Sequence, residues 1–327
     1  MSKPAAHIRL GFIPLNDCAP LAVAKEKGFF AEEGLDVTLS REPSWANIRD
    51  KLAVGAIDGA HMLAPMVLAA SLGVGAYPTP MITPLALNRN GSAFTVSTAL
   101  AEAMAKASLA DVVRKRIEQG LPPLRFAVVF PYSMHNYELR GWLADAGVDP
   151  DRHVRISVVP PPRMAEQLEA GMIDGFCAGE PWNALAVARG SGKVAVRAIE
   201  IWPNGPDKVL GVTRAWAERN PALLESMIKA LIRGAAWADA PENRDELSSL
   251  LATATYVGAP KVVIAQSLAD IVFFRDGAGE PRLDHAEWFL AQMRRWGQIA
   301  DSVDRPAVAA EVYQPSIFQA VFARAGA

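Results

Sequence analysis

A repeat of two similar segments constrains the fold of this chain more than any other feature of its sequence. The segment Gly55-Ala-Ile-Asp-Gly59 matches Gly171-Met-Ile-Asp-Gly175, at a spacing of about 116 residues. The opening segment Ile8–Pro14 likewise matches Arg125–Pro131, and each is followed by a helical stretch that ends near a glycine and then by another strand. A repeat of whole βαβαβ units is architectural. The sequence therefore predicts two similar α/β lobes, with the loops at the carboxyl ends of their strands facing a cleft.

Two turn-rich segments divide the chain between these lobes. Asn88-Arg-Asn-Gly-Ser92 predicts the first crossing from one lobe to the other, and Trp202-Pro-Asn-Gly-Pro206 predicts the return. Two connections are typical of a hinge that closes a cleft around a ligand. We therefore predict a two-lobed α/β fold in which each lobe is a doubly wound sheet. The predicted division places residues 1–89 and 207–327 in lobe 1 and residues 90–206 in lobe 2, with hinges near 88–93 and 200–207.

The stretch around Trp45 shows the local plan. Ser44 is a good N-cap for a helix over Trp45–Val54, and Gly55 suits the left-handed residue that ends such a helix. Ile57–Met62 then reads as a short apolar strand. Trp45 is therefore expected, exposed, at the positive end of a helix, where a small anion could be held. Further helices are expected at Ala99–Gln119, Pro221–Asp239, Asn243–Thr253, Pro260–Leu268, His285–Trp296 and Arg305–Glu311.

The charge and the cysteines limit the class of protein. A net charge of −2 over 327 residues gives no general reason to expect nucleic acid or an anionic membrane as a partner. No apolar run approaches the ~18 residues that span a bilayer. Cys18 and Cys177 both lie in apolar runs, and two buried free thiols are favoured over the disulfide that their strand-end positions also allow.

The amino terminus bears on location. Residues 1–6 lead directly into the first strand, with no apolar signal-peptide core and no cleavage site. If Met1 is the native start, we expect the protein in the cytoplasm. A chain trimmed of its signal peptide would look the same and would belong to the periplasm.

The motifs of common catalytic sites are missing. The sequence has no Gly-x-Ser-x-Gly elbow, no His-Glu-x-x-His, no Gly-x-Gly-x-x-Gly after the first strand and no phosphate-binding P-loop. Asp58 and Asp174 follow helix-ending glycines at equivalent places, which favours a structural turn role over an acid/base pair. None of the histidines outside the second-lobe loop has metal-ligand spacing, and His61, on a buried strand, is interpreted as a core residue. The sequence thus indicates a protein that is not an enzyme and needs no cofactor.

Four side chains are candidates for ligand contact. Trp45 offers an indole N–H and an apolar wall, or else folds back onto its own helix. His135, in the strand-to-helix loop of the second lobe, either donates to an anion as imidazolium or caps the helix. Lys208 either reaches into the hinge side of the cleft as a compact positive charge or stays exposed in its loop. Trp182, at a strand end of the second lobe, covers the ligand or packs in the core.

Four motifs are specific when taken together. They are Ile13–Asp17, Glu42–Lys51, Asp58–Met66 and Asp174–Trp182. In these motifs, and over the whole chain, the sequence resembles the nitrate-binding branch of the type II periplasmic-binding-protein-like superfamily. That branch includes the nitrate- and bicarbonate-binding components of cyanobacterial ABC transporters. The resemblance implies a two-lobed fold that closes over a small planar anion.

The resemblance also implies a ligand set. In that family a tryptophan, a histidine and a lysine hold the anion, and the matching positions are Trp45, His135 and Lys208. The nitrate binders also use a glutamine in an Asn-Gly-Gln stretch, where this chain has Asn90-Gly-Ser92, so Ser92 would reach the anion only through a water. Bicarbonate-binding relatives replace the lysine by an acidic residue that helps to hold calcium, so Lys208 favours nitrate or nitrite without a metal. The complete predicted ligand-binding set is Trp45, His135, Lys208, Ser92, Asn47 and Trp182.

The absent signal peptide gives a further resemblance, to the NasS type of cytoplasmic nitrate/nitrite sensor. Proteins of that type restrain an RNA-binding antiterminator of the ANTAR class and release it when the anion binds. The sequence thus implies a cytoplasmic regulator of nitrate assimilation with an ANTAR-domain partner and no direct contact to nucleic acid. The alternative is the periplasmic substrate-binding component of a nitrate, or related small-anion, ABC transporter, with an ABC permease as partner. An enzyme on the same fold is a third hypothesis, although the thiamine-pathway type is expected to show a cysteine-rich segment, which two isolated cysteines do not provide.

Overall fold

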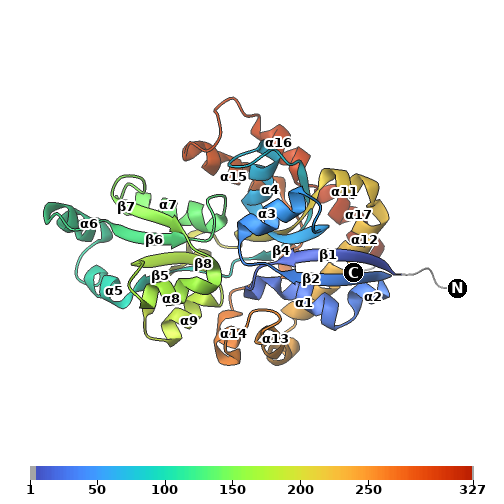
Figure 1. Ribbon diagram of the computed structural model, residues 1–327, viewed down its shortest axis with the longest axis horizontal. Helices are drawn as coiled ribbons and strands as arrows, with labels where there is room; N and C mark the ends of the chain where they lie inside the picture. The colour runs from blue at the N-terminus through green and yellow to red at the C-terminus, as the bar shows by residue number, and fades with distance from the viewer. Residues whose placement is uncertain (1–4, 326–327) are drawn as a thin grey trace.

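The computed structural model describes residues 5–325 and shows two α/β lobes, each built on one five-stranded sheet (Figure 1). The first sheet has the strand order β2-β1-β3-β10-β4, and the second has the order β7-β6-β8-β5-β9. The strands of the first sheet are β1 (Ala6–Phe12), β2 (Leu35–Arg41), β3 (Gly59–Leu63), β4 (Met81–Arg89) and β10 (Pro206–Thr213). Those of the second sheet are β5 (Ser92–Ser97), β6 (Leu124–Val128), β7 (Val154–Val158), β8 (Gly175–Gly179) and β9 (Gly192–Arg197). The predicted two-lobed α/β fold is confirmed.

The two sheets have the same topology. In each, four strands run in the same direction, and one antiparallel strand, β10 or β5, lies between the third of them and the last strand of the sheet. The chain passes from β4 in the first sheet to β5 in the second, and returns from the second lobe at β10. Each inserted strand therefore begins at the edge where the parallel strands end. In the register of the sheets, Ser92 pairs with Gly179 and Lys208 pairs with Leu63.

Helices cover both faces of each sheet (Figure 1). Those of the first lobe up to the first crossing are α1 (Ala19–Glu26), α2 (Phe29–Glu32), α3 (Trp45–Ala53) and α4 (Ala64–Leu72). Those of the second lobe are α5 (Thr98–Met104), α6 (Leu109–Glu118), α7 (Met134–Asp145), α8 (Met164–Glu169), α9 (Trp182–Ala188) and α10 (Ala198–Ile201). The chain ends in α11 (Arg214–Arg219), α12 (Pro221–Asp239), α13 (Arg244–Leu251), α14 (Lys261–Ser267), α15 (Leu283–Arg295), α16 (Arg305–Val312) and α17 (Pro315–Ala325). Within residues 5–325, no helix combines the length and the apolar character needed to cross a membrane.

Short-range sequence signals correctly predicted most of these helices and strands, but not all. Ser44 caps α3 by accepting from the Asn47 backbone N–H, and Gly55 has φ of 70°, as its sequence position predicts. The single helix predicted over Ala99–Gln119 is wrong, because the hydroxyl of Ser108 accepts from Asp111 N at 3.1 Å and starts a new helix, α6. The final helix, α17, is not among the predicted elements. Both cysteines are free and buried, as predicted.

The repeat is visible in its hydrogen bonds. In the first lobe, Arg9 N donates to Asp58 Oδ2 at 2.8 Å and Arg9 Nη2 donates to Gly55 O at 2.9 Å. In the second lobe, Arg125 N donates to Asp174 Oδ2 at 2.7 Å and its Nη2 donates to the carbonyl of the equivalent glycine at 2.8 Å. Each carboxylate thus ties the turn before a buried strand to the first strand of its lobe. The structural role predicted for Asp58 and Asp174 is confirmed.

The two crossings are held together by the side-chain amide of Asn88. Asn88 Nδ2 donates to Asn90 O at 2.9 Å, and Asn88 Oδ1 accepts from the Lys208 backbone N–H at 3.1 Å. Asn90 has φ of 58° and Gly91 has φ of 90°. A Cβ at Gly91 would lie 2.5 Å from Ile271 Cγ1, so a larger residue would both clash and strain this turn. The start of β10, with Lys208, is therefore fixed relative to the outgoing crossing.

Candidate functional site

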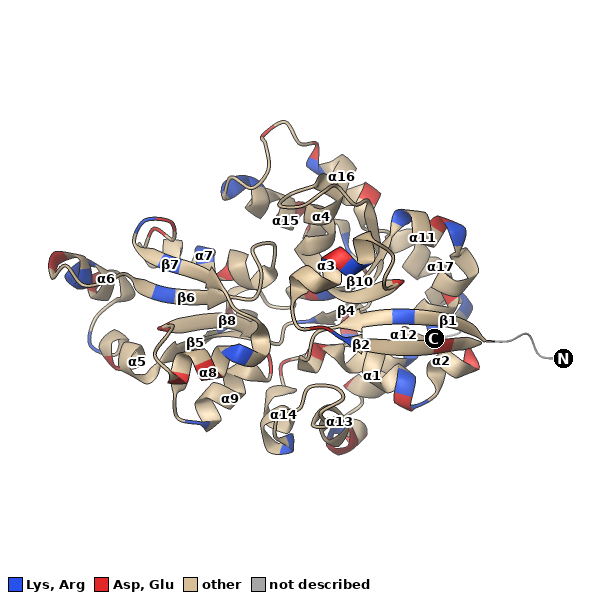
Figure 2. Ribbon diagram, viewed as in Figure 1, with Lys and Arg blue, Asp and Glu red and all other residues tan. Residues whose placement is uncertain are grey.

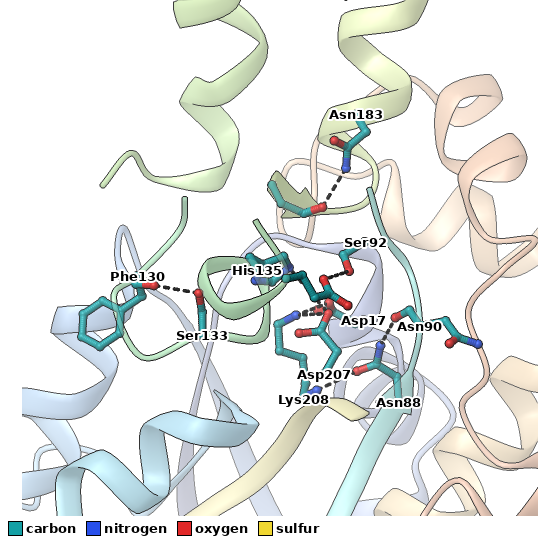
Figure 3. Close-up of polar contacts among 12 residues, drawn as sticks. Asp17, Asn88, Asn90, Ser92, Phe130, Ser133, His135, Asn183, Asp207 and Lys208 are labelled. Carbon is teal, nitrogen blue, oxygen red and sulfur yellow. Dashed lines mark hydrogen bonds and ion pairs between the residues drawn. The ribbon is translucent and has the colours of Figure 1, made fainter. Parts of the chain in front are cut away.

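Side chains from five separate segments meet at the carboxyl ends of the parallel strands. Figure 3 shows three of them, Asp17, His135 and Lys208. Asp17 comes from the loop after β1, His61 from β3 and Trp45 from the first residue of α3. His135 lies in the first turn of α7, and Lys208 lies near the start of β10. The side chains of all five are sealed from solvent, with exposures between 0% and 1%. Two helix N-termini, those of α3 and α7, therefore open onto one buried site.

Lys208 is the centre of a buried ion cluster made of Asp17, His61, Asp207 and Lys208. Its Nζ lies 2.8 Å from Asp17 Oδ2 and 2.6 Å from Asp207 Oδ2; the second contact is an ion pair without hydrogen-bond alignment. His61 Nε2 lies 2.7 Å from Asp17 Oδ1. Ile13 N donates to His61 Nδ1 at 3.4 Å, which leaves Nε2 as the ring nitrogen that donates to Asp17. The cluster thus contains two carboxylates and one ammonium.

The pKa values follow from this burial and pairing. Burial by itself would raise the pKa of Asp17, but Lys208 and His61 outweigh it and hold that pKa at about 2. Burial likewise works against the charge on Lys208, but Asp17 and Asp207 reverse the effect and raise the pKa of the ammonium. Both groups are therefore charged at neutral pH. Lys208 brings a positive charge into the site, but that charge is already shared with two carboxylates.

Three ring nitrogens in the site have no hydrogen-bond partner within the described residues. Trp45 Nε1 has no hydrogen-bond partner within the described chain, although the side chain is only 1% exposed. The same holds for both ring nitrogens of His135, whose Nε2 is 3.7 Å from Asp207 Oδ2. The expectation of an exposed Trp45 is wrong, because its ring packs 5.3 Å from the His61 ring and 5.8 Å from Lys208 Nζ. Buried polar groups normally have partners, so these ring nitrogens point to a ligand that accepts hydrogen bonds.

The site suits a small anion better than a metal ion. Ammonium, indole N–H and imidazole groups are all donors, and the positive ends of α3 and α7 add to the field. Within residues 5–325, no group of three or more His, Cys, Asp or Glu side chains is arranged to hold a metal. Along the ribbon, acidic and basic residues are interspersed in both lobes (Figure 2). The donors gathered in the buried site are the feature that favours an anion.

Comparison with known proteins identifies the relatives of this architecture. Residues 2–252 match the model of the NMT1-like family. The chain belongs to the NMT1-like family. Within it, the chain falls in the branch of periplasmic-binding-protein-like proteins that includes NrtA. It is 34% identical to the nitrate/nitrite binding protein NrtA of a Nostoc species, over 89% of this chain and 71% of that protein.

A solved structure and a longer relative support the same placement. The crystal structure of the periplasmic nitrate-binding protein NrtA from Synechocystis superimposes with a TM-score of 0.93 at 29% identity, covering 98% of this chain and 89% of that one. The chain is also 39% identical to the nitrate import ATP-binding protein NrtC of Synechocystis, over 95% of its own length and 49% of the relative's. It thus spans about half the length of the first curated relatives it matches. Those relatives are binding and transport proteins.

The structure does not bring all of the predicted ligand-binding residues together. Trp45, His135 and Lys208 meet in the buried site, and Ser92 lies beside it, donating to Glu138 Oε2 at 3.4 Å. Asn47 is outside, because its exposed side chain accepts from the Ser44 hydroxyl in the cap of α3. Trp182 directs its indole elsewhere: Nε1 donates at 3.0 Å to the carbonyl of Pro14 in the first lobe.

Sequence reasoning also missed members of the site. Asp17, Asp207 and Glu138 are buried there, and His61 belongs to the ion cluster instead of the apolar core. A usable signal existed for Asp17, because it follows the first strand just as His135 follows the equivalent strand of the second lobe. For Asp207 the signal was its position next to Lys208. Glu138 had a weaker signal, a carboxylate one turn after His135 in a helix.

Proposed function

We propose that this chain binds nitrate or nitrite and serves as the solute-binding component of an ABC importer for small anions. One observation carries the proposal: Lys208 and the free N–H groups of Trp45 and His135, drawn from both lobes, converge in a site sealed from solvent. Nitrate and nitrite are flat and small, and their oxygens accept hydrogen bonds but donate none. They therefore match the N–H groups that Trp45 and His135 present beside the Lys208 ammonium.

Closure of the lobes supports a binding role. Trp182 Nε1 donates to Pro14 O at 3.0 Å, and Asn16 N donates to Glu180 O at 2.8 Å, so the two lobes touch directly beside the site. An anion that contacts both lobes binds the closed arrangement more tightly than an open one. This difference in affinity sets how far the anion shifts the protein toward the closed arrangement. A permease that recognises the closed arrangement would then accept only the loaded protein.

The relatives favour transport over sensing. NrtC and CmpC are named as ATP-binding proteins of nitrate import and bicarbonate transport, and NrtA is named as a nitrate/nitrite binding protein. None of these names supports the ANTAR-domain partner that the sequence implied. On the transport hypothesis the protein acts outside the cytoplasmic membrane. Fractionation of the native host and amino-terminal sequencing test this location, and recovery of the protein in the cytoplasm with Met1 intact would instead favour a sensor.

Calorimetry with purified protein tests the ligand directly. Nitrate, nitrite, bicarbonate and an aliphatic sulfonate are titrated separately, with and without added calcium. We expect nitrate or nitrite to bind with a Kd of about 1 μM, which corresponds to about −8 kcal/mol. Calcium is expected to make no difference, because Lys208 supplies the cation. Strong binding of the sulfonate with no response to nitrate or nitrite would contradict the proposal.

Trp45→Phe separates the indole donor from the aromatic wall. Because Trp45 Nε1 has no partner within residues 5–325, its removal costs no hydrogen bond seen in the structure, and thermal unfolding without added anion should change little. A hydrogen bond to a charged group contributes about 1.5–3 kcal/mol, so nitrate affinity should fall by roughly 10- to 150-fold. Trp216→Phe, at a half-buried tryptophan of α11, is the matched control and should leave the affinity unchanged. Equal nitrate affinities for Trp45→Phe and wild type would show that the indole N–H makes no hydrogen bond to the anion.

A further inference from the structure

Glu138 is a buried carboxyl group that the proposed ligand set does not use. It lies on α7 one turn after His135, on the same face of the helix, and is only 4% exposed. Its Oε2 accepts from the hydroxyl of Ser92 at 3.4 Å. Ser92 is the first residue of β5, the place in the second lobe that corresponds to the start of β10 in the first. Glu138 therefore stands at the second-lobe side of the anion site.

Its charged neighbours are unfavourable to an ionised form. The titratable and charged groups around Glu138 come from α7, β8, β10 and the loop after β1: His135, Cys177, Asp207, Lys208 and Asp17. Lys208 already faces two carboxylates, so an ionised Glu138 would be a third carboxylate against one ammonium in a sealed site. Burial, reinforced by Asp207, raises the pKa of Glu138 to about 8. A carboxyl group kept neutral by its surroundings is a hydrogen-bond donor.

We propose that Glu138 is a specificity-determining residue that meets the bound anion as a neutral carboxylic acid and donates one hydrogen bond to it. With the Ser92 hydroxyl donating to Oε2, we place the carboxyl proton on Oε1, which would face the ligand. Ser92 is then a positioning residue that orients Glu138, in place of the water-mediated contact expected from the sequence. The inference rests on the proposed function, because it requires the ligand to be a small anion.

A neutral Glu138 would discriminate between anions that carry an O–H group and anions that carry none. Nitrate and nitrite present only acceptor oxygens to the Glu138 acid. Bicarbonate carries an O–H of its own, and a neutral Glu138 offers it a weaker acceptor than the ionised carboxylate, because Oε1 carries the proton and Oε2 already accepts from Ser92. A site that is built to donate disfavours a ligand that leaves its polar groups unpaired. Glu138 therefore selects proton-free oxyanions at neutral pH, and this selectivity weakens as the carboxyl ionises.

The experiment compares wild type with Glu138→Gln and Glu138→Leu by calorimetry at pH 7 and pH 9. Nitrate, nitrite, bicarbonate and an aliphatic sulfonate are tested, and the anion that binds wild type best at pH 7 is followed. Glutamine keeps an N–H donor and does not titrate, whereas leucine keeps only bulk. Glu180→Gln is the matched control: it is a buried second-lobe carboxyl whose pKa is also raised to about 8 by burial, but its Oε2 accepts from Ala184 N at 3.1 Å at the start of α9.

Wild-type and Glu180→Gln affinities should fall by about tenfold from pH 7 to pH 9, because the neutral fraction of a group with that pKa falls by this factor. Glu138→Gln should match wild type within about threefold at pH 7 and stay flat to pH 9. Glu138→Leu should bind at least about tenfold more weakly at pH 7. Wild-type affinity for Glu138→Leu, or the same pH dependence in Glu138→Gln as in wild type, would overturn the inference. Tight sulfonate binding alone would refute nitrate as ligand but leave the Glu138 comparison valid, and no binding of any of the four anions would overturn both.

Discussion

Lys208→Met is expected to abolish anion binding and to lower the stability of the protein. Methionine fills a similar volume with an unbranched chain but carries no charge. Without the ammonium, Asp17 and Asp207 remain buried with no cation, and an anion would enter a site of uncompensated negative charge. Removing one partner of a buried ion pair typically costs about 3–5 kcal/mol. Chemical denaturation and nitrate calorimetry measure the two effects.

A double variant distinguishes lost binding from lost stability. Adding Asp207→Asn to Lys208→Met removes one of the two stranded charges, so most of the lost unfolding free energy should return while nitrate binding stays absent. Lys193→Met, at an exposed position on β9, is the control and should alter neither quantity. Nitrate binding within a few-fold of wild type in the double variant would show that the ammonium is not the cation of the site.

The sequence predicted the architecture well because its signals are local and duplicated. Glycine-ended helices and apolar strands recur at one spacing, and a repeated βαβαβ unit has few ways to fold. The predicted boundaries of helices were wrong where a single side chain outweighs a continuous helical pattern. Ser108 illustrates this, since one hydroxyl that accepts from Asp111 N divides what reads as one long amphipathic helix.

The site was only partly predictable because charges from distant segments compensate one another there. Lys208 was expected to offer its charge directly to the ligand, but Asp17, 191 residues away in the chain, binds the same ammonium. His61 lies on β3, a strand whose residues are all buried. Such a strand shows no alternation of polar and apolar residues, so nothing in the sequence indicates a polar contact from His61. Its role depends on Asp17, which only the folded chain brings within 2.7 Å. The spacing of residues along the sequence does not predict ion pairs and hydrogen bonds of this kind between distant segments.

Trp182 and Asn47 are members of the predicted ligand-binding set for which the structure shows other partners. Trp182 is a candidate because it lies at a strand end, with core packing as the alternative, and Asn47 is named only as a member of the set. The fold gives each a structural partner instead: Trp182 donates across the lobes to Pro14 O, and Asn47 takes part in the cap of its own helix. An indole N–H or an amide near a site is therefore informative only when its polar atoms have no other partner. Among the predicted ligand-binding residues, Trp45 and His135 meet that criterion.

His135 should make anion binding stronger as the pH falls. Burial lowers the pKa of His135 to about 4, although Asp207 opposes the shift, so the imidazole is neutral in the protein at pH 7. A bound anion beside His135 favours the imidazolium, which places the pKa in the complex above that of the free protein. Binding then takes up a proton wherever the pH lies between these two pKa values. Nitrate affinity should rise between pH 6.5 and pH 4.5, and His135→Gln should abolish the rise.

The same histidine has the opposite effect on the stability of the protein without anion. The unfolded chain has an ordinary histidine pKa near 6.5, so below that pH it binds a proton that the folded protein does not. His135 therefore lowers the unfolding free energy as the pH falls from 6.5 to 4. Glu138 and Glu180 act in the other direction, because their folded-state pKa values of about 8 favour the folded protein as the pH falls toward 4.5. His285, with a pKa of about 4 from burial, adds to the effect of His135.

Because these contributions oppose one another, the pH dependence of the wild-type unfolding free energy is a poor test of the role of His135. The difference in unfolding free energy between wild type and a His135 variant is a better test. The unfolding free energy of wild type minus that of His135→Gln, measured by denaturant titration, should fall by roughly 2–3 kcal/mol from pH 6.5 to pH 4.5. Glu138 and Glu180 cancel in this difference. With saturating nitrate the fall should shrink or reverse, since the anion stabilises the imidazolium. A difference that stays constant with pH, both with and without nitrate, would mean that His135 does not change its protonation on unfolding or on binding.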